Sequence, residues 1–307
     1  MEISLKVLVA VLTTGSRSTT FEQCLLSIIE QKINNNIELS ILVVENNLKH
    51  NQLVGDSLSK FSNESEVKII HALETKKGIP YARNNALTFA TNKSYDYLAF
   101  IDDDAFAQQN WLQSLCSKMN GFDVVAGPQK AIFPANTAKY FNLASLYHER
   151  KVNEGVVVKW AATNNILIDV NTMQKFNLKF NESLIHGGED KELFLRLTAS
   201  GGKISWVQSA IVQEHIVQER LTTKWALRRC FRMGATGFKI ESCNKSFFKV
   251  LSTCAFKGTA YIVKGLLSFL PFLISPKRTH LDSLCDLSHG FGFFYGILSG
   301  GKVRSYA

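Results

Sequence analysis

The sequence predicts an α/β protein with a mainly parallel sheet flanked by helices, and three observations support this prediction. Short apolar runs alternate with helical stretches through the first half of the chain, and polar clusters follow the ends of the apolar runs. Hydrophobic residues make up 46% of the 307 residues, which is enough to bury a sizeable core and excludes a disordered chain. Repeated strand–helix units favour parallel pairing, because each helix returns the chain to the same end of the sheet.

Five apolar runs in the first half are expected to be strands, at residues 5–12, 40–44, 67–72, 97–101 and 124–126. Helices are expected between them at residues 21–31, 80–90 and 110–119, and the apolar spacing is most clearly helical in the first. Ser18, Thr19 or Thr20 would cap that first helix, and Pro80 suits the first turn of the second.

The second half of the chain is less regular. Helices are expected at residues 138–150, 189–200 and 222–238, and a strand at residues 165–169. A Gly187-Gly188 turn would start the second of these helices. We place a domain boundary at residue 220, which separates an α/β domain (residues 1–220) from a basic, apolar, helical C-terminal extension (residues 221–307).

Three consecutive carboxylates, Asp102-Asp103-Asp104, follow the apolar run at residues 97–101. Ligands of parallel sheets bind at the carboxyl ends of the strands, which is where this cluster would lie. Adjacent carboxylates repel one another unless a cation or hydrogen-bond donors neutralise them, and their hard oxygen atoms suit Mg²⁺ or Mn²⁺. A solvated acidic turn is the structural alternative, but the apolar run that delivers the cluster to the ligand edge favours a cation site.

Three further residues have both a functional and a structural interpretation. Arg83 lies near an expected helix start and could hold a phosphate, although surface arginines are common. Asp190 lies in the first turn of an expected helix, where it could be a general base or simply favour the helix N-terminus. His215 follows an expected strand and could complete a metal site, although a lone histidine is more often structural.

Taken together and in order, five segments resemble glycosyltransferase family 2, a large inverting family with a GT-A fold. They are residues 11–14 (VLTT), 43–47 (VVENN), 77–84 (KGIPYARN), 101–104 (IDDD) and 188–196 (GEDKELFLR). The stretch from Glu214 to Gly234 also resembles bacterial members that build exopolysaccharide or surface glycans. Two residues depart from the family pattern, since Glu45 replaces the usual Asp and Lys77 replaces the usual Asn, so the donor is left open.

The resemblance implies a GT-A fold with a Rossmann-like sheet, a divalent cation (Mg²⁺ or Mn²⁺) and a set of residue roles. Thr13 and Glu45 would surround the nucleobase and ribose of the donor, and Arg83 would contact its nucleotide. Asp102 would reach the ribose or the metal, Asp104 would ligate the metal, and His215 would contact the metal or the diphosphate.

The same resemblance implies that Asp190 is the catalytic base. Asp103 is expected to tolerate replacement best, and Asn164 and Asn165 are guessed to lie near the acceptor. The implied activity is that of a hexosyltransferase. It would move a sugar from a UDP- or dTDP-linked donor to a glycan or a lipid-diphosphate-linked acceptor in the synthesis of cell-envelope polysaccharide.

Charge and cysteine content suggest where the chain acts. The net charge is +9, and six cysteines occur without a Cys-x-x-Cys pair or a recognisable zinc spacing. These features, with no signal peptide at the N-terminus, favour the reducing cytoplasm, and no nucleic acid is expected as a partner. The basic helix at residues 222–238 and the apolar segment at residues 247–274 suit peripheral binding to the anionic inner face of the cytoplasmic membrane. A helical layer packed on the core explains them equally well.

Other classes of protein fit the sequence less well. A dinucleotide-binding oxidoreductase is not supported, because no Gly-x-Gly-x-x-Gly segment follows a strand, and there is no P-loop. A metal-dependent phosphohydrolase could also use strand-end aspartates, and a non-catalytic, membrane-associated binding module would need neither a base nor turnover. These two alternatives remain open at this point.

Overall fold

The computed structural model describes residues 4–243, 245–270 and 279–301, and the chain in it forms two compact units. The first comprises residues 1–130, 150–185 and 189–214, and the second comprises residues 131–149, 186–188 and 215–307. The chain enters the second unit for the last time between Glu214 and His215, close to the boundary predicted at residue 220. Two shorter segments of the first 220 residues also belong to the second unit.

An eight-stranded sheet forms the centre of the first unit, in the order β3-β2-β1-β4-β9-β6-β10-β8. The strands are β1 (Leu5–Thr13), β2 (Ile37–Glu45), β3 (Lys68–Leu73), β4 (Tyr97–Asp102), β6 (Val124–Ala126), β8 (Val157–Val158), β9 (Asn165–Asp169) and β10 (Ile204–Trp206). Four of the pairings are parallel, whereas β9 runs antiparallel to β4 and β6 and β8 runs antiparallel to β10. The predicted mainly parallel sheet is therefore confirmed.

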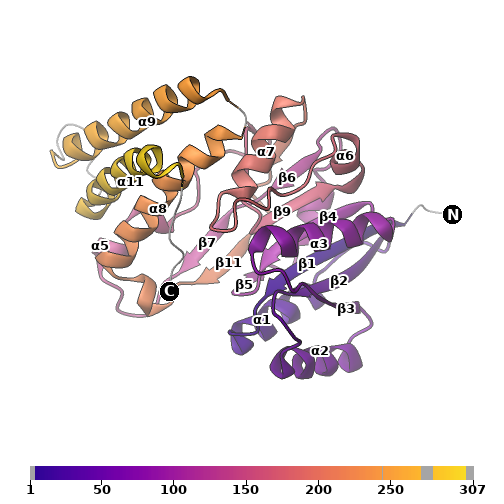
Figure 1. Ribbon diagram of the computed structural model, residues 1–307. Helices are drawn as coiled ribbons and strands as arrows, with labels where there is room; N and C mark the ends of the chain where they lie inside the picture. The colour runs from indigo at the N-terminus through magenta and orange to yellow at the C-terminus, as the bar shows by residue number, and fades with distance from the viewer. Residues whose placement is uncertain (1–3, 244, 271–278, 302–307) are drawn as a thin grey trace. The chain divides into compact units, whose positions relative to one another are not determined.

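Helices cover both faces of this sheet (Figure 1). They are α1 (Ser18–Ile29), α2 (Gln52–Glu64), α3 (Ile79–Asn92), α4 (Trp111–Cys116), α6 (Val170–Lys175) and α7 (Glu189–Ala199). Successive residues of a strand point to opposite faces, so Val9 belongs to the core cluster that includes residues of α1, α2 and α4. Leu8 belongs to the other cluster, which includes residues of α3, α6 and α7. Burial on both faces explains why β1 reads as a continuous apolar run rather than an alternating one.

One prediction about local structure in the first unit is wrong, and another is confirmed only in part. The first helix begins at Ser18, so Arg17 occupies its N-cap position and makes no side-chain capping bond. The helix predicted at residues 110–119 is confined to α4, since the chain leaves the helix at Ser117. Helix α2 was not expected at all, because its sequence is polar and contains Gly55.

A second sheet has the order β5-β11-β7, formed by β5 (Ala105–Ala107), β11 (Val212–His215) and β7 (Gln129–Ile132). Strands β5 and β11 pair antiparallel, with Glu214 opposite Ala105. This pairing brings the segment after the three aspartates beside the segment that ends at Glu214.

Three long helices dominate the second unit, α8 (Thr223–Ser242), α9 (Phe247–Leu267) and α11 (His280–Ser299), and they pack against one another (Figure 1). Their close approach depends on glycine. A Cβ on Gly234 would strike the carbonyl oxygen of His289, and a Cβ on Gly292 would strike that of Phe231. Part of the apolar segment predicted at residues 247–274 forms α9, and its residues beyond 270 lie outside the described part of the chain.

The helix predicted at residues 138–150 is wrong. Only α5 (Lys139–Asn142) and the 3₁₀ turn η1 (Ser145–Tyr147) form there, and another 3₁₀ turn, η2 (Gln218–Arg220), precedes α8. Ala144 adopts an extended conformation and is fully buried in the core of the second unit. The backbone N–H of Ser145 donates to Oδ1 of Asp282 at 2.7 Å, a partner that no local pattern reveals.

Candidate functional site

Three neighbouring strands of the first unit end in polar residues at one edge of the sheet. Thr13 ends β1 and lies opposite Glu45, which ends β2, while Leu12 lies opposite Asp102, which ends β4. Because β1 runs parallel to both neighbours, the carboxyl ends of all three strands lie together (Figure 1). This is the edge at which open α/β sheets bind their ligands.

The acid cluster, which we define as Asp102, Asp103 and Asp104, is held by groups from the first strand and the loop that follows it. The hydroxyl of Thr13 donates to Oδ2 of Asp103 at 2.7 Å. The guanidinium of Arg17 donates to Oδ1 of Asp103 at 3.2 Å and to Oδ2 of Asp104 at 2.5 Å. Sequence analysis missed Arg17, whose side chain is 45% exposed and supplies the positive charge that adjacent aspartates require.

These contacts do not fit the expectation that Asp103 tolerates replacement best. Asp103 is 8% exposed and binds both Thr13 and Arg17. Burial raises the pKa of Asp103 even though these donors favour its charged form. Replacing Asp103 would leave the Thr13 hydroxyl without its acceptor, so Asp103 positions the β1 end against the cluster.

A fourth carboxylate that sequence analysis missed, Glu214 on β11, lies near the acid cluster. Its Oε2 accepts a hydrogen bond from Gln129 at 2.7 Å, and Gln129 in turn accepts one from Asn164. Burial raises the pKa of Asp102 to about 7, Arg83 opposes the rise, and Asp104, Glu214 and Asp103 add to it by charge repulsion. Four carboxylates are therefore gathered at this edge of the sheet, where burial and mutual repulsion favour the neutral form of Asp102.

Arg83 and Glu189 form a buried ion pair between α3 and α7. Arg83 is 8% exposed and Glu189 is 3% exposed, and one oxygen of Glu189 accepts from the Arg83 guanidinium. Its other oxygen, Oε2, has no hydrogen-bond partner among the described residues. Burial raises the pKa of Glu189, with Arg83 opposing the rise and Asp190 adding to it. The guanidinium also lies 5.6 Å from the centre of the Phe180 ring, so its orientation is fixed.

Asp190 follows Glu189 in the first turn of α7 and is partly exposed. Its Oδ1 accepts from the backbone N–H of Lys191 at 2.6 Å, which keeps the carboxylate at the helix N-terminus, where the helix dipole favours an anion. The predicted glycine turn before the helix is present, since Gly187 and Gly188 have φ angles of 110° and 91°.

Glu45 is fully buried, and protein groups already contact both of its oxygens. Oε1 accepts from the side chain of Asn47 at 2.9 Å and from the backbone of Asn51 at 2.7 Å. Oε2 faces His50 at 3.3 Å and His71 at 3.0 Å. Burial alone would raise the pKa of Glu45, but these hydrogen bonds outweigh it and lower the pKa. The two histidines were not singled out from the sequence.

His215 and Asn165, which were singled out from the sequence, differ in burial. His215 ends β11, is exposed, and falls in the second unit, so its predicted role as a metal ligand remains a prediction. Asn165 is fully buried, and its amide bonds Pro128, Ala210 and Trp111 at 2.7–2.8 Å. These hydrogen bonds use the side-chain amide of Asn165 to join structural elements, and the guess that Asn165 lies near the acceptor stays a prediction.

Comparisons with known proteins show the family and the fold of the chain. A family model described as glycosyl transferase family 2 matches residues 9–179, more than half of the chain. The succinoglycan biosynthesis protein ExoM of Rhizobium meliloti (strain 1021) is 29% identical over 161 residues, which are 52% of this chain and 51% of ExoM. The chain thus spans about half the length of that curated relative.

Solved structures of TarS from S. aureus share the fold. The crystal structure of TarS 1-349 in complex with UDP superposes with a TM-score of 0.52 at 15% identity, covering 97% of this chain and 92% of that one. Another structure of TarS 1-349 has a TM-score of 0.54 at 15% identity, covering 75% and 65% of the two chains. At this identity the likeness concerns the fold, and it confirms the predicted GT-A arrangement.

Proposed function

The chain belongs to glycosyltransferase family 2, and we propose that it is an inverting hexosyltransferase of surface polysaccharide biosynthesis. It would move a sugar from a nucleoside-diphosphate donor to a hydroxyl group of a glycan or lipid-diphosphate-linked acceptor. The observation that carries the proposal is the acid cluster at the ligand edge of the sheet, where Asp102 has a pKa raised to about 7. A purely structural acidic turn has no need to crowd Asp102, Asp104 and Glu214 together.

The donor set of the acid cluster fits a divalent cation. Asp104 and Asp102 supply hard oxygen ligands of the kind that Mg²⁺ and Mn²⁺ prefer, and Arg17 now supplies the positive charge beside them. Arg17 is nearly half exposed, so its guanidinium can move into solvent when a cation takes over the positive charge beside the cluster. When bound, the cation would neutralise the charge on the leaving diphosphate. His215 is retained as a proposed further contact to the cation or the diphosphate.

The residues of the chain divide the remaining tasks. Thr13 and Arg83 are proposed to line the nucleotide subsite. Glu45 would act there by holding the loop at residues 46–51, since both of its oxygens already contact protein groups. Asp190 would take the proton of the acceptor hydroxyl as that oxygen attacks the anomeric carbon from the face opposite the diphosphate. The bond to the diphosphate breaks in the same displacement, so the configuration inverts.

The identity of the donor and acceptor rests on the relatives. TarS structures contain UDP or UDP-GlcNAc, which favours a uridine nucleotide here, with a dTDP-linked sugar as the other candidate. ExoM is described as a protein of succinoglycan biosynthesis, which favours a growing glycan or its lipid-linked precursor as the acceptor.

The proposed base is tested by Asp190→Asn, which keeps the shape of the side chain but removes the base. We expect nucleotide binding close to that of the wild type and a loss of transfer of roughly 10²–10⁴-fold, the usual contribution of a general base. Asp56→Asn is the matched control, because Asp56 is an exposed carboxylate on α2. Transfer by Asp190→Asn at the wild-type rate, measured with UDP-sugars and Mn²⁺, would refute the assignment.

A peripheral site at the inner face of the cytoplasmic membrane is proposed from the outward surface of α9. None of the helices in the described parts of the chain is long and apolar enough to cross a bilayer. Instead, Phe248 is 81% exposed, Phe256 75%, Val263 48% and Leu267 45%, and they recur at helical spacing along one face. We call these four residues the outer face of α9. Because this face is apolar and lysines of the helix flank it, α9 suits an anionic lipid surface.

A further inference from the structure

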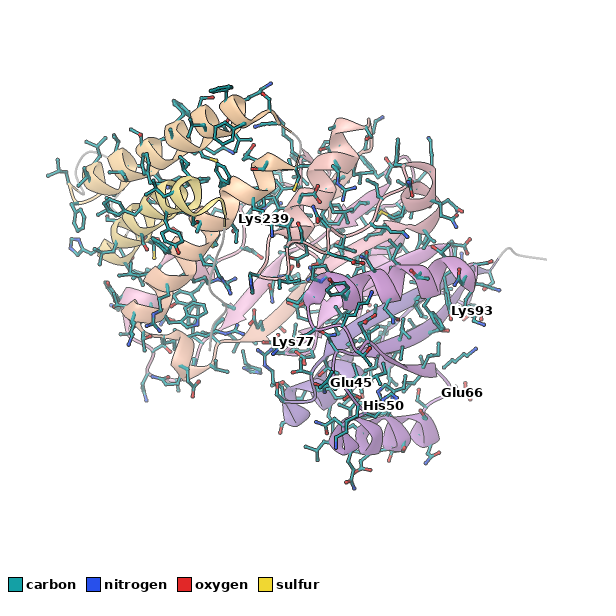
Figure 2. All side chains as sticks on the ribbon, in the orientation of Figure 1. Glu45, His50, Glu66, Lys77, Lys93 and Lys239 are labelled. Atoms are coloured by element: carbon teal, nitrogen blue, oxygen red, sulfur yellow. The ribbon has the colours of Figure 1, made fainter. Side chains whose placement is uncertain are left out.

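We propose that Glu45, His50 and His71 bind a divalent transition-metal ion, with Zn²⁺ the best fit, at a site separate from the acid cluster. Glu45 ends β2, His50 directly precedes the N-cap of α2, and His71 lies on β3. Figure 2 shows Glu45 and His50 next to each other at the end of β2. All three residues belong to the first unit, and neither the sequence pattern nor the proposed transfer reaction assigns a metal to them.

The separations of the three ligand atoms match a metal site. Oε2 of Glu45 lies 3.0 Å from Nε2 of His71 and 3.3 Å from Nδ1 of His50, and the two nitrogens are 3.2 Å apart. A tetrahedral zinc ion with ligands at about 2.0 Å holds neighbouring ligand atoms roughly 3.3 Å apart. An ion can therefore lie above this triangle, in contact with all three atoms, without a large movement of any side chain.

Protons satisfy this triangle only when both ring nitrogens carry a hydrogen and donate to Glu45. If one nitrogen carries no hydrogen, its lone pair faces the carboxylate at 3.0–3.3 Å. A cation removes this dependence on the ring hydrogens, because all three atoms then present lone pairs to one positive charge. Two imidazoles and one carboxylate favour zinc or a similar ion over Mg²⁺, which prefers oxygen.

The surrounding groups hold the carboxylate as a metal ligand is usually held. Oε1 of Glu45 is fixed by Asn47 and by the backbone of Asn51, which leaves Oε2 to face the histidines. The His50 side chain is 56% exposed and that of His71 24%, so an ion reaches the site from solvent. With three protein ligands, a fourth position stays open to water or an anion.

The site is tested on the full chain after treatment with a chelator, by zinc titration calorimetry in saturating Mg²⁺. We expect one zinc ion per chain, and an affinity at least about tenfold weaker in His50→Gln and in His71→Gln. His50 lies in an exposed loop, so its replacement leaves the fold intact even if that of His71 does not. The control is His148→Gln, which replaces an exposed imidazole of the second unit.

Cobalt(II) gives an independent readout. The wild-type chain should develop visible d–d absorption with Co²⁺, and His50→Gln should lose it. Asp104→Ala should keep both the zinc and the cobalt signal, so failure of the proposed transferase would not imitate failure of this site. Absence of zinc binding by the wild type, or equal binding by the wild type and both histidine variants, overturns the proposal.

Discussion

Two buried carboxylates, one in each unit, lie in the first turn of a helix but are used differently. In the second unit, Asp282 accepts from Ser145 through one oxygen and from Thr279 through the other, which completes a capping box on α11. In the first unit, Glu189 has one oxygen on Arg83 and a second with no hydrogen-bond partner in the described chain. Hydrogen bonds of the fold satisfy both oxygens of Asp282. Among the described residues they satisfy only one oxygen of Glu189.

The contrast extends to the two units as wholes. The first unit gathers charged groups at the ligand edge of its sheet, where the exposed Arg17 and the buried Arg83 offset the negative charge of the acid cluster. The second unit packs its helices through glycine and places apolar side chains on the outside of α9. The first unit thus gathers charged groups where we propose the transfer site, and the second unit exposes apolar side chains where we propose membrane binding.

The largest expected effect on stability comes from breaking the buried ion pair of the first unit. Arg83→Gln would leave Glu189 buried beside Asp190 without its counter-charge, which typically costs about 3–5 kcal/mol. Urea denaturation measures this loss. Lys60→Gln is the comparison, because Lys60 pairs with Glu22 in the same unit and both side chains are more than a third exposed. An equal loss in both variants would contradict the special role given to the Arg83 pair.

Helix packing in the second unit should be nearly as sensitive. Gly292→Ala places a methyl group against the carbonyl of Phe231, and such overpacking costs about 1–3 kcal/mol. The control lies in the first unit, where a Cβ on Gly55 of α2 meets nothing within 4 Å. Gly55→Ala should stabilise by about 0.5–1 kcal/mol, because glycine is a poor helix former. Thermal unfolding measures the change in stability of both variants. If both variants are stabilised, or both are destabilised, this account of the glycines is wrong.

The same contrast explains what could be predicted from the sequence. Strands β1 and β9 are buried on both faces, so their apolar runs reveal them directly. The predicted helical C-terminal extension is present, but the bounds of α11 were not predicted, because Gly290, Gly292 and Gly296 lower its local helix propensity. The partners that require glycine there lie on other helices. The local sequence pattern therefore predicts a strand or helix where burial alone decides its structure.

The site was predictable to the same extent. The strand-end residues Thr13, Glu45 and Asp102 follow from the apolar runs before them. Glu214 reaches the acid cluster through its register opposite Ala105, which the sequence does not encode locally. Arg17 had one usable signal, a fixed positive charge four residues after the first strand end.

A smaller, pH-dependent effect is expected at Glu241, which accepts hydrogen bonds from Lys245 and Lys257 in the second unit. Burial raises the pKa of Glu241, but the two lysines outweigh it and lower the pKa overall. A lowered pKa in the folded state means that the stabilisation is present above the unfolded value, near 4.3, and is lost as the pH falls through the folded value. Glu241→Gln should therefore cost about 1 kcal/mol at neutral pH and nothing in acid. A difference from the wild type that persists at low pH would contradict this.

A substitution on the outer face of α9 should have the smallest effect on stability, but it should weaken binding to membranes. Phe256→Ser removes an exposed ring, so the free energy of unfolding should change by less than about 0.5 kcal/mol. Binding to vesicles that contain anionic lipid should weaken, because less apolar area enters the interface. Leu48→Ser is the matched control, since Leu48 is 86% exposed but lies in a loop of the first unit. If both variants sediment with anionic vesicles as the wild type does, and high salt releases none of them, the outer face of α9 is not a membrane surface. The exposed apolar side chains of α9 would then have to bind a partner other than a membrane.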